Sequence, residues 1–297
     1  MGEVLISGLV AGGIYGILAL GIVIVYRGSR VLNFAQAEMG TFGCYIAWWF
    51  IEERGQPWLV GAAAALIGVG LLSAGFERYV VRAMTSSPRV TVAVASVGLL
   101  LFLLALEIKV WGSSPRFLGG PISGRPIDSP ILGYLVSWTQ WFALLVAAGV
   151  GLGLNAFLRK TDFGLGVLAA SQDPAAARMV GVPYARVSMF TWVTAGVLGT
   201  LAVLLVEPTV GAFFPGHFSV GANALFIPAL AAALIGRLEN LTHAFLGGLG
   251  VGIVQQAIQR QFVDSTIPGV ATLAVFAIII ATLYVRAPSA QLKGEAA

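Results

Sequence analysis

The stretch RKTDFGLGVLAASQDPAAARMVGVPYAR, residues Arg159–Arg186, is the longest polar interruption between two strongly apolar runs of this chain. Asp173 is suited to cap a short helix, Pro174 falls at its first position, and Gly181 is suited to end it. Apolar residues at helical spacing predict a preceding helical turn over Phe163–Ala170. The pattern therefore predicts one or two short helices lying beside a membrane. Two interpretations remain open: an ordinary cytoplasmic connection, or a docking element for a soluble partner.

The composition indicates whether this chain folds in water or in a membrane. Hydrophobic residues make up 58%, charged residues 10%, and the mean hydropathy is +0.90, values that exclude an ordinary soluble domain. The single cysteine, Cys44, excludes a disulfide framework and a cysteine-based metal site. The net charge of +4 requires no nucleic-acid partner, because the basic residues fall between the apolar runs. The chain is therefore expected to be a polytopic membrane protein without a cofactor.

The apolar runs predict an all-α fold, a membrane helix bundle of about eight to nine transmembrane helices in a single domain over residues 1–297. A helix needs about 20 residues to cross the hydrocarbon core. One or two helices are expected to be broken, the second and seventh runs being the least regular, and the tail from about 288 to 297 to be disordered. The first run is too long for a signal peptide. The predicted segments are Leu5–Tyr26, Phe34–Ile51, Pro57–Phe76, Val90–Lys109, Trp138–Leu158, Val187–Glu207, Ser219–Gly236, His243–Gln261 and Thr266–Val285.

The distribution of basic residues predicts the orientation of the bundle. With nine crossings and the N-terminus outside, 12 of the 17 Lys and Arg residues face the cytoplasm and five face outward. This asymmetry satisfies the positive-inside rule. The stretch 159–186 then lies in the cytoplasm together with the C-terminus. In the first segment, Gly8, Gly12 and Gly16 recur at four-residue spacing and predict close helix packing.

Polar residues interrupt the second segment. Asn33, Gln36 and Glu38 stand at its start, and Thr41 follows one helical turn later. An ionisable residue at membrane depth is a functional-site candidate, and a broken helix is tolerated only against protein or water. The alternative is that Asn33 caps a helix at the interface while Glu38 pairs with Arg30. Both interpretations stay open on the sequence alone.

Three stretches together resemble one family. GGIYGILALGIVIVYRGSRVLNFAQAEMGTFGCY (Gly12–Tyr45), TVAVASVGLL (Thr91–Leu100) and AASQDPAAARMVGV (Ala169–Val182) are similar, in this order, to LivH-type permeases of branched-chain amino-acid ABC importers. ABC importer permeases in general meet their ATPase through a Glu-Ala-Ala motif that is followed by three residues and then Gly, the spacing of Ala175–Ala177 and Gly181 here. Here Ala175 stands in the place of the Glu. A second departure is Ala37, where many members carry Gly.

The resemblance implies a transport subunit rather than an enzyme. No phosphate-binding loop is present, because the only Lys-Thr pair, Lys160-Thr161, follows Arg159 instead of a Gly-rich turn. The implied partners are a second related permease subunit, two ABC ATPase subunits, an extracytoplasmic solute-binding protein and the lipid of a bacterial or archaeal plasma membrane. Residues expected to couple to the ATPase are Asp173, Pro174, Ala177, Arg178 and Gly181. Residues expected along the translocation pathway are Asn33, Gln36, Glu38, Thr41, Ser96 and Asn223.

Other functions remain as alternatives. Relatives of this kind include permeases for urea and short amides, so the resemblance does not fix the substrate. A passive channel would pair two Asn-bearing half-helices at Asn33 and Asn223, although both lack the Pro that fixes such turns. An ion-coupled secondary transporter would need intramembrane acids, for which Glu38 is the candidate.

Overall fold

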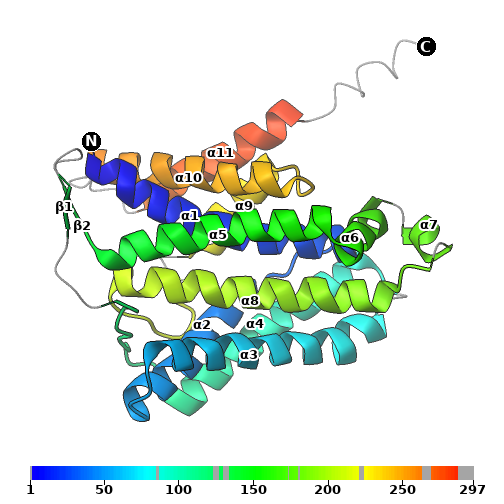
Figure 1. The fold of residues 1–297 in the computed structure, drawn as a ribbon, viewed down its shortest axis with the longest axis horizontal. Coiled ribbons are helices and arrows are strands. Elements are labelled where there is room, and N and C mark those ends of the chain that lie inside the picture. The colour runs from blue at the N-terminus through cyan, green and yellow to red at the C-terminus, as the bar shows by residue number, and fades with distance from the viewer. Residues whose placement is uncertain are drawn as a thin grey trace.

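The computed structural model describes residues 2–84, 87–122, 127–129, 134–172, 174–179, 181–220, 224–262 and 269–286. Within them, six helices are long and apolar enough to cross a membrane. The helices lie side by side along one direction, and α6 and α7 stand at one end of the bundle (Figure 1). The six are α1 (Gly2–Ser29), α3 (Trp58–Phe76, which continues through π and 3-10 turns to Met84), α4 (Arg89–Trp111), α5 (Trp138–Lys160), α8 (Tyr184–Val210) and α10 (Leu241–Gln261).

Three other predicted segments correspond to shorter helices. They are α2 (Gln36–Trp48, with a π turn at Trp49–Glu53), α9 (Phe226–Ile235) and α11 (Val270–Arg286). The seventh segment was predicted to begin at Ser219, but the ten residues of α9 span only about 15 Å, half the hydrocarbon thickness. The expected irregularity of the second and seventh segments is confirmed. The tail 288–297 lies outside the described residues.

Two short helices and one hairpin complete the described chain. The hairpin pairs β1 (Ile127–Ser129) with β2 (Tyr134–Val136) at the end of the bundle opposite α6 (Asp162–Gln172) and α7 (Pro174–Met179). The all-α expectation therefore needs one small amendment, because a two-stranded hairpin forms in the loop before α5. Ser137 caps α5 through a capping box with Gln140.

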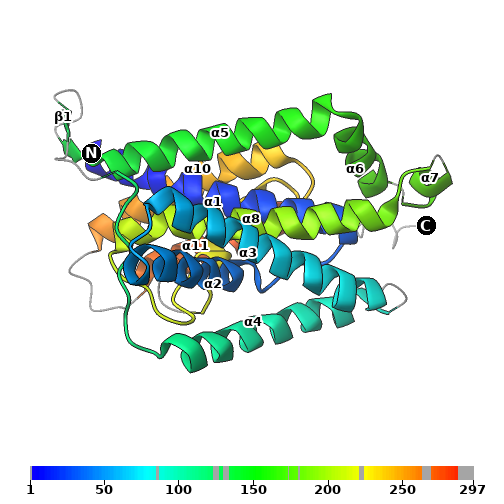
Figure 2. The same ribbon diagram turned by 60° about the horizontal axis from the view of Figure 1, so that its bottom comes forward.

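The first helix forms the centre of the bundle. From Gly12 to Val25 every residue of α1 is buried. The helix packs against α5, α8, α9 and α10, and Figure 2 shows it between α5 and α8. The predicted glycine packing is confirmed on α1, which meets α10 without intervening side chains. A Cβ added at Gly12 would lie 2.6 Å from the Cα of Leu249, and one at Gly8 would lie 2.7 Å from the Cα of Ile253. Only glycine permits this approach of two backbones.

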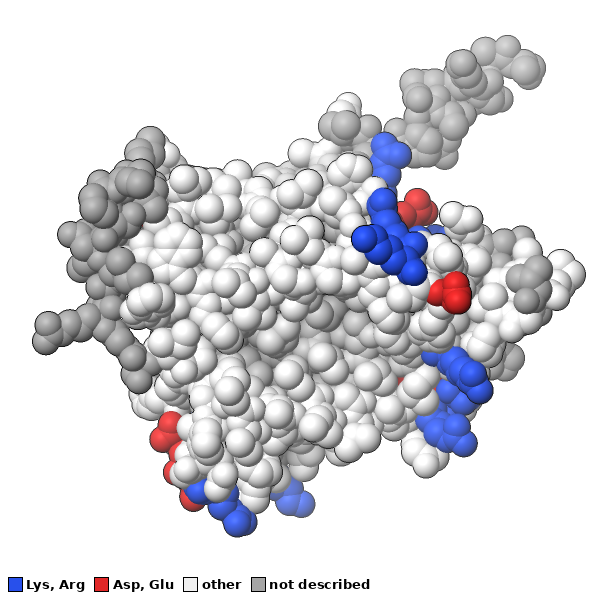
Figure 3. Space-filling model, in the orientation of Figure 1, with Lys and Arg blue, Asp and Glu red and all other residues white. Residues whose placement is uncertain are grey.

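Charged side chains mark the ends of the bundle. On the face drawn in Figure 3, Lys and Arg gather at the end that carries α6 and α7. A smaller group of both signs lies at the opposite end, and the broad band between the two ends is free of charge. This distribution is what a protein spanning a hydrocarbon layer requires.

Candidate functional site

The connection between α1 and α2 is an irregular segment buried inside the bundle. Asn33 is fully buried, and its side-chain oxygen accepts the N–H of Ala35 at 3.1 Å. The N–H of Phe34 donates to Ser96 Oγ of α4 at 3.1 Å, and that hydroxyl donates to the carbonyl of Ala93 at 2.7 Å. Ser96 thus holds the connection against α4. Asn33 accepts its bond before the helix begins, and α2 itself starts at Gln36 with no side-chain cap.

Gln36 joins three helices at the first position of α2. Its Nε2 donates to the carbonyl of Leu18 on α1 at 3.0 Å. Space for it exists because glycines face it, Gly21 on α1 and Gly199 on α8. Further along α2, Gly40 lies against α8, where an added Cβ would come 2.6 Å from the carbonyl oxygen of Gly199. Gln36 and these glycines fix where α2 starts and how deeply it sits.

Glu38 faces a buried acidic group and not an arginine. The hydroxyl of Ser219 donates to its Oε2, and the carboxyl of Glu107 on α4 lies within hydrogen-bonding reach. Both glutamates are fully buried, and no described N–H or hydroxyl group donates a hydrogen bond to either oxygen of Glu107. The alternative pairing of Glu38 with Arg30 is wrong, because the α1–α2 connection carries the two side chains apart. A contact between two carboxyl groups needs a proton on one of them, since like charges repel strongly at this depth.

A third buried acid lies near the end of α8. Glu207 is fully buried and accepts the backbone N–H of Leu118 at 3.0 Å. Glu107 and Glu207 were both missed by the sequence analysis. Both could have been identified by the rule that identified Glu38, because each is an ionisable residue within an apolar run.

The turn after α8 carries a histidine between aromatic rings. His217 is 6% exposed and its ring stacks on Phe214 at 4.3 Å and on Phe218 at 4.6 Å. Burial lowers the pKa of His217, with a smaller opposing effect from its hydrogen bond to Ala212. The histidine is therefore neutral near pH 7 and packs as an aromatic residue.

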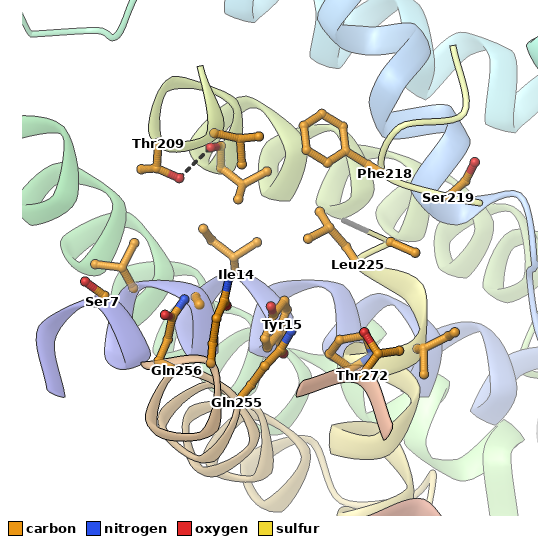
Figure 4. A pocket seen from close by; sticks show the side chains of 18 of the residues that line it. Ser7, Ile14, Tyr15, Thr209, Phe218, Ser219, Leu225, Gln255, Gln256 and Thr272 are labelled. Atoms are coloured by element: carbon orange, nitrogen blue, oxygen red, sulfur yellow. Dashed lines mark hydrogen bonds between the residues drawn. The ribbon is translucent and has the colours of Figure 1, made fainter. Parts of the chain in front are cut away.

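A cavity of about 720 Å³ opens beside this turn, between α1, α8, α10 and α11. Figure 4 shows Gln255 and Gln256 rising from α10 and Tyr15 from α1 into the same space, opposite Phe218 and Leu225. The described residues of the lining carry hydroxyl and amide groups, and none of them is charged. Its polar residues are Ser7, Tyr15, Gln140, Thr209, Ser219, Gln255, Gln256, Gln259 and Thr272.

The described residues predicted for the pathway lie next to this cavity and do not line it. Ser219 lines the cavity and also bonds Glu38, so it links the two. Asn33, Gln36, Glu38 and Ser96 cluster behind that link, all fully buried. Thr41 is buried too, but its hydroxyl bonds the carbonyl of Ala37 within its own helix. Asn223 lies outside the described residues.

The short helices α6 and α7 form where the sequence predicted them, and α7 starts and ends at the predicted residues. Pro174 is the first residue of α7, and Gly181 has a φ of +85°. The N–H of Val182 donates to the carbonyl of Ala177 at 2.9 Å, which is the hydrogen bond of a glycine-terminated helix end. Ala177 is buried at 4% exposure. Asp173 lies outside the described residues, and for Arg178 only the backbone position in α7 is described.

A junction of side chains connects α6 to the C-terminal end of α1. Arg30 donates to the carbonyl of Ser171 at 2.8 Å, and Arg27 Nε donates to the hydroxyl of the same residue at 3.3 Å. Arg30 also forms an ion pair with Glu239 at 3.7 Å, in the turn before α10. The hydroxyl of Tyr184 donates to the carbonyl of Gly28 at 3.1 Å. We call this set the arginine junction; it joins α1, α6, α8 and the α9–α10 turn.

Comparisons with known proteins agree on one family. Residues 4–283 match the family model described as "Branched-chain amino acid transport system / permease component". The chain is 25% identical to the high-affinity branched-chain amino acid transport permease BraD of Pseudomonas aeruginosa, over 84% of both chains. It is 24% identical to LivH of Escherichia coli K12, over 92% of this chain and 91% of that one.

The similarity extends to an archaeal protein and to a solved structure. A probable LivH of Methanocaldococcus jannaschii is 23% identical over 82% of this chain and 76% of its own. Among solved structures, a chain of PsaBC from Streptococcus pneumoniae in complex with Fab superposes with a TM-score of 0.51 at 17% identity, covering 94% of this chain and 89% of that one. At that identity the superposition speaks for the fold alone.

Proposed function

This chain belongs to the branched-chain amino acid transport system permease family, and we propose that it forms one half of the translocation pathway of an importer for branched-chain or other small amino acids. As a member of that family it is a multi-pass permease component of an ABC transporter, not an enzyme, and ATP is hydrolysed by a separate subunit. The observation that carries the pathway proposal is the polar cavity, linked through Ser219 to the buried Glu38.

The proposed assembly has this chain as a single permease domain beside a second, related permease. Two ATPase subunits bind on the cytoplasmic side, and an extracytoplasmic solute-binding protein delivers the substrate. The proposed orientation puts the N-terminus outside and the stretch 159–186 in the cytoplasm of a bacterial or archaeal cell. Eight or nine segments cross the membrane in this arrangement, with α2 and α9 as the broken ones. The gathering of Lys and Arg around α6 and α7 supports this orientation.

The proposed mechanism uses α7 as the element that meets the ATPase. Its movement on ATP binding would reach Ser171 at the end of α6, which is bonded to both arginines of the arginine junction. Arg30 stands at the start of the α1–α2 connection, so a displaced Ser171 shifts the connection that carries Asn33 and Gln36. α2 then moves Glu38 relative to Ser219 and opens the cavity toward the inside. Pro174, Ala177, Arg178 and Gly181 act in docking, with Asp173 as the proposed cap.

Copurification tests the assembly. The tagged chain is purified from native membranes in mild detergent, and its companions are identified by mass spectrometry. A second permease and a Walker-type ATPase are the expected companions. A homo-oligomer without an ATPase, reproducible after cross-linking, would overturn the importer assembly and favour the channel or ion-coupled alternatives.

One observation favours a second substrate class. The described residues that line the cavity offer amide and hydroxyl groups, and none of them is a charged group that could pair with the carboxylate or ammonium of an amino acid. A small neutral amide, including urea, would satisfy the glutamines without burying an ion. Uptake of labelled leucine and labelled urea by the reconstituted importer separates the two classes. Uptake of leucine without uptake of urea supports the amino-acid proposal. Uptake of urea without uptake of leucine would overturn it in favour of an amide substrate.

A further inference from the structure

We propose that a groove at the cytoplasmic end of α10 binds an anionic phospholipid of the inner leaflet. The lipid phosphate would lie between Arg27 and Arg237, and an acyl chain would follow α10 toward the middle of the membrane. The groove has a volume of about 1150 Å³ and runs between the α9–α10 turn, α10 and α11. The inference rests on the proposed orientation, which places this end of α10 at the cytoplasmic surface.

The groove changes from polar to apolar along one face of α10. Asn240 and His243 line its start, Gly247 and Gly250 its middle, and Val254 its far end. These positions repeat at three or four residues and so lie on one side of the helix. From the first to the last they span about 21 Å at 1.5 Å per residue, which exceeds one leaflet of a core about 30 Å thick. A polar entrance above an apolar trough has the profile of a headgroup and its chain.

The wall of the trough is exposed on the surface of this chain. Leu246 is 55% exposed and Val254 is 41% exposed. Ile278 of α11 forms the opposite wall. Gly250 leaves the floor open, since a Cβ added there meets nothing within 4 Å among the described residues. A larger side chain at 250 would occupy this open space at the floor of the trough.

The entrance carries an excess of positive charge. Within the described part of the chain, the side chain of Arg237 makes no hydrogen bond or ion pair. Arg27 uses Nε on Ser171, which leaves its terminal N–H groups available. Among the described residues that line the entrance, the one acid is Glu239, which forms an ion pair with Arg30 at 3.7 Å. An anionic headgroup gains about 1 kcal/mol from each nearby basic residue at such a surface.

The turn that presents Arg237 is held in an unusual conformation. Arg237 and Leu238 have φ angles of +59° and +56°, which non-glycine residues rarely adopt. Backbone hydrogen bonds fix this turn, from Arg237 N–H to Leu234 at 2.8 Å and from Leu238 N–H to Ala233 at 2.9 Å. The position of Arg237 at the mouth of the groove is thereby set by the backbone.

The same helix offers an internal contrast. On its outer half, α10 turns Gln255, Gln256 and Gln259 into the polar cavity. On its cytoplasmic half, it presents only glycine and aliphatic residues below the entrance. A water-soluble substrate fits the first surface and a hydrocarbon chain fits the second.

Lipid titration of the intact transporter complex tests the proposal. The complex is delipidated in detergent, titrated with dioleoylphosphatidylglycerol or dioleoylphosphatidylcholine, and examined by native mass spectrometry. The expected result is tighter binding of the phosphatidylglycerol, weakened about fivefold by Arg237→Gln, the factor that corresponds to one basic residue. Gly250→Leu is expected to weaken both lipids by filling the trough. Equal binding of the two lipids by the wild-type complex would overturn the proposal.

Matched variants and a competitor separate this site from general effects. Arg89→Gln removes a basic residue at the start of α4, and Gly98→Leu fills an equally open position on the same helix. Both should leave lipid binding unchanged; loss in either to the same extent as in Arg237→Gln would overturn the proposal. Displacement of the lipid by sn-glycerol 3-phosphate would identify a soluble phosphate site instead. Labelling of Arg237→Cys with an impermeant maleimide in inside-out vesicles tests the orientation separately.

Discussion

Two polar regions of this bundle differ in the burial and the pairing of their charged groups. In the arginine junction, Arg30 and Glu239 are 34% and 64% exposed, and the contacts of Arg27 and Arg30 each join a donor to an acceptor or a cation to an anion. In the acidic group around α2, Glu38, Glu107 and Glu207 are fully buried, and none of them forms an ion pair with a described residue. Exposed ion pairs contribute little to stability, whereas buried polar groups without partners cost several kcal/mol. The junction is therefore consistent with a flexible linkage, and the acidic group with a site kept for function.

The largest effect is expected in the acidic group. Glu38→Leu removes the acceptor of Ser219 and leaves Glu107 with an apolar neighbour. A buried hydrogen bond to a carboxylate is worth about 1.5–3 kcal/mol, so uptake should fall about ten- to a hundredfold. Initial uptake rates are measured at matched amounts of protein in the membrane. Glu38→Gln keeps an acceptor for Ser219 and should fall less; unchanged uptake in Glu38→Leu would remove the acidic group from the pathway.

The next effect concerns α7, the helix that we propose meets the ATPase. Gly181→Pro forces φ to about −65° at a residue whose φ is +85°, so the end of α7 cannot form. Coupled transport should fall about tenfold, since strained backbone positions cost about 1–3 kcal/mol. Stimulated ATPase activity of the purified complex is the measurement. Gly181→Ala tolerates the conformation at about 1 kcal/mol and should lie between wild type and Gly181→Pro; equal activity in all three would contradict the docking role of α7.

A smaller effect is expected within the junction itself. Arg30→Gln removes the ion pair with Glu239 and the bond to Ser171, both partly exposed, so uptake should fall about two- to threefold. Arg30 has a φ of +56°, which is strained for any residue except glycine. Arg30→Gly therefore loses the same contacts but removes a backbone strain of about 1 kcal/mol. Thermal unfolding should therefore rank Arg30→Gly above Arg30→Gln. The opposite ranking would show that the side-chain contacts outweigh the backbone.

The smallest effect is a pH dependence at the turn beside the acidic group. Burial lowers the pKa of His217, so the folded protein binds fewer protons there than the unfolded chain. Its contribution to stability is constant above the unfolded value of about 6.5 and decreases as the pH falls below it. The unfolding temperature is measured at pH 7.5 and 5.5 for wild type and His217→Phe, which keeps the ring stack. The drop should be smaller in the variant; an equal drop would assign the pH dependence to the carboxyl groups.

The sequence predicted the parts of the fold that local patterns determine. Each apolar run became a helix, and the Pro174 and Gly181 signals marked the ends of α7 because caps depend on neighbouring residues only. The site depended on distant contacts. Ser219, the partner of Glu38, stands 181 residues away along the chain, and Glu107 is its neighbour only because α4 packs on α2. The glutamines of α10 were not among the predicted site residues, because only the packing of α1 and α11 encloses them in a cavity.

The glycine contact between α1 and α10 also has a consequence in time. Gly12 packs on Leu249, so the central helix of the bundle completes its surroundings only after a partner made about 240 residues later has entered the membrane. At about 5–20 residues per second, synthesis of that interval takes on the order of ten seconds to a minute. During this interval α1 presents its glycine face to lipid, where other segments with small-residue faces compete for it. Assembly of this protein is thus governed by the delayed arrival of α10, and slowed translation ahead of α10 should lower the yield of folded permease without altering its final stability.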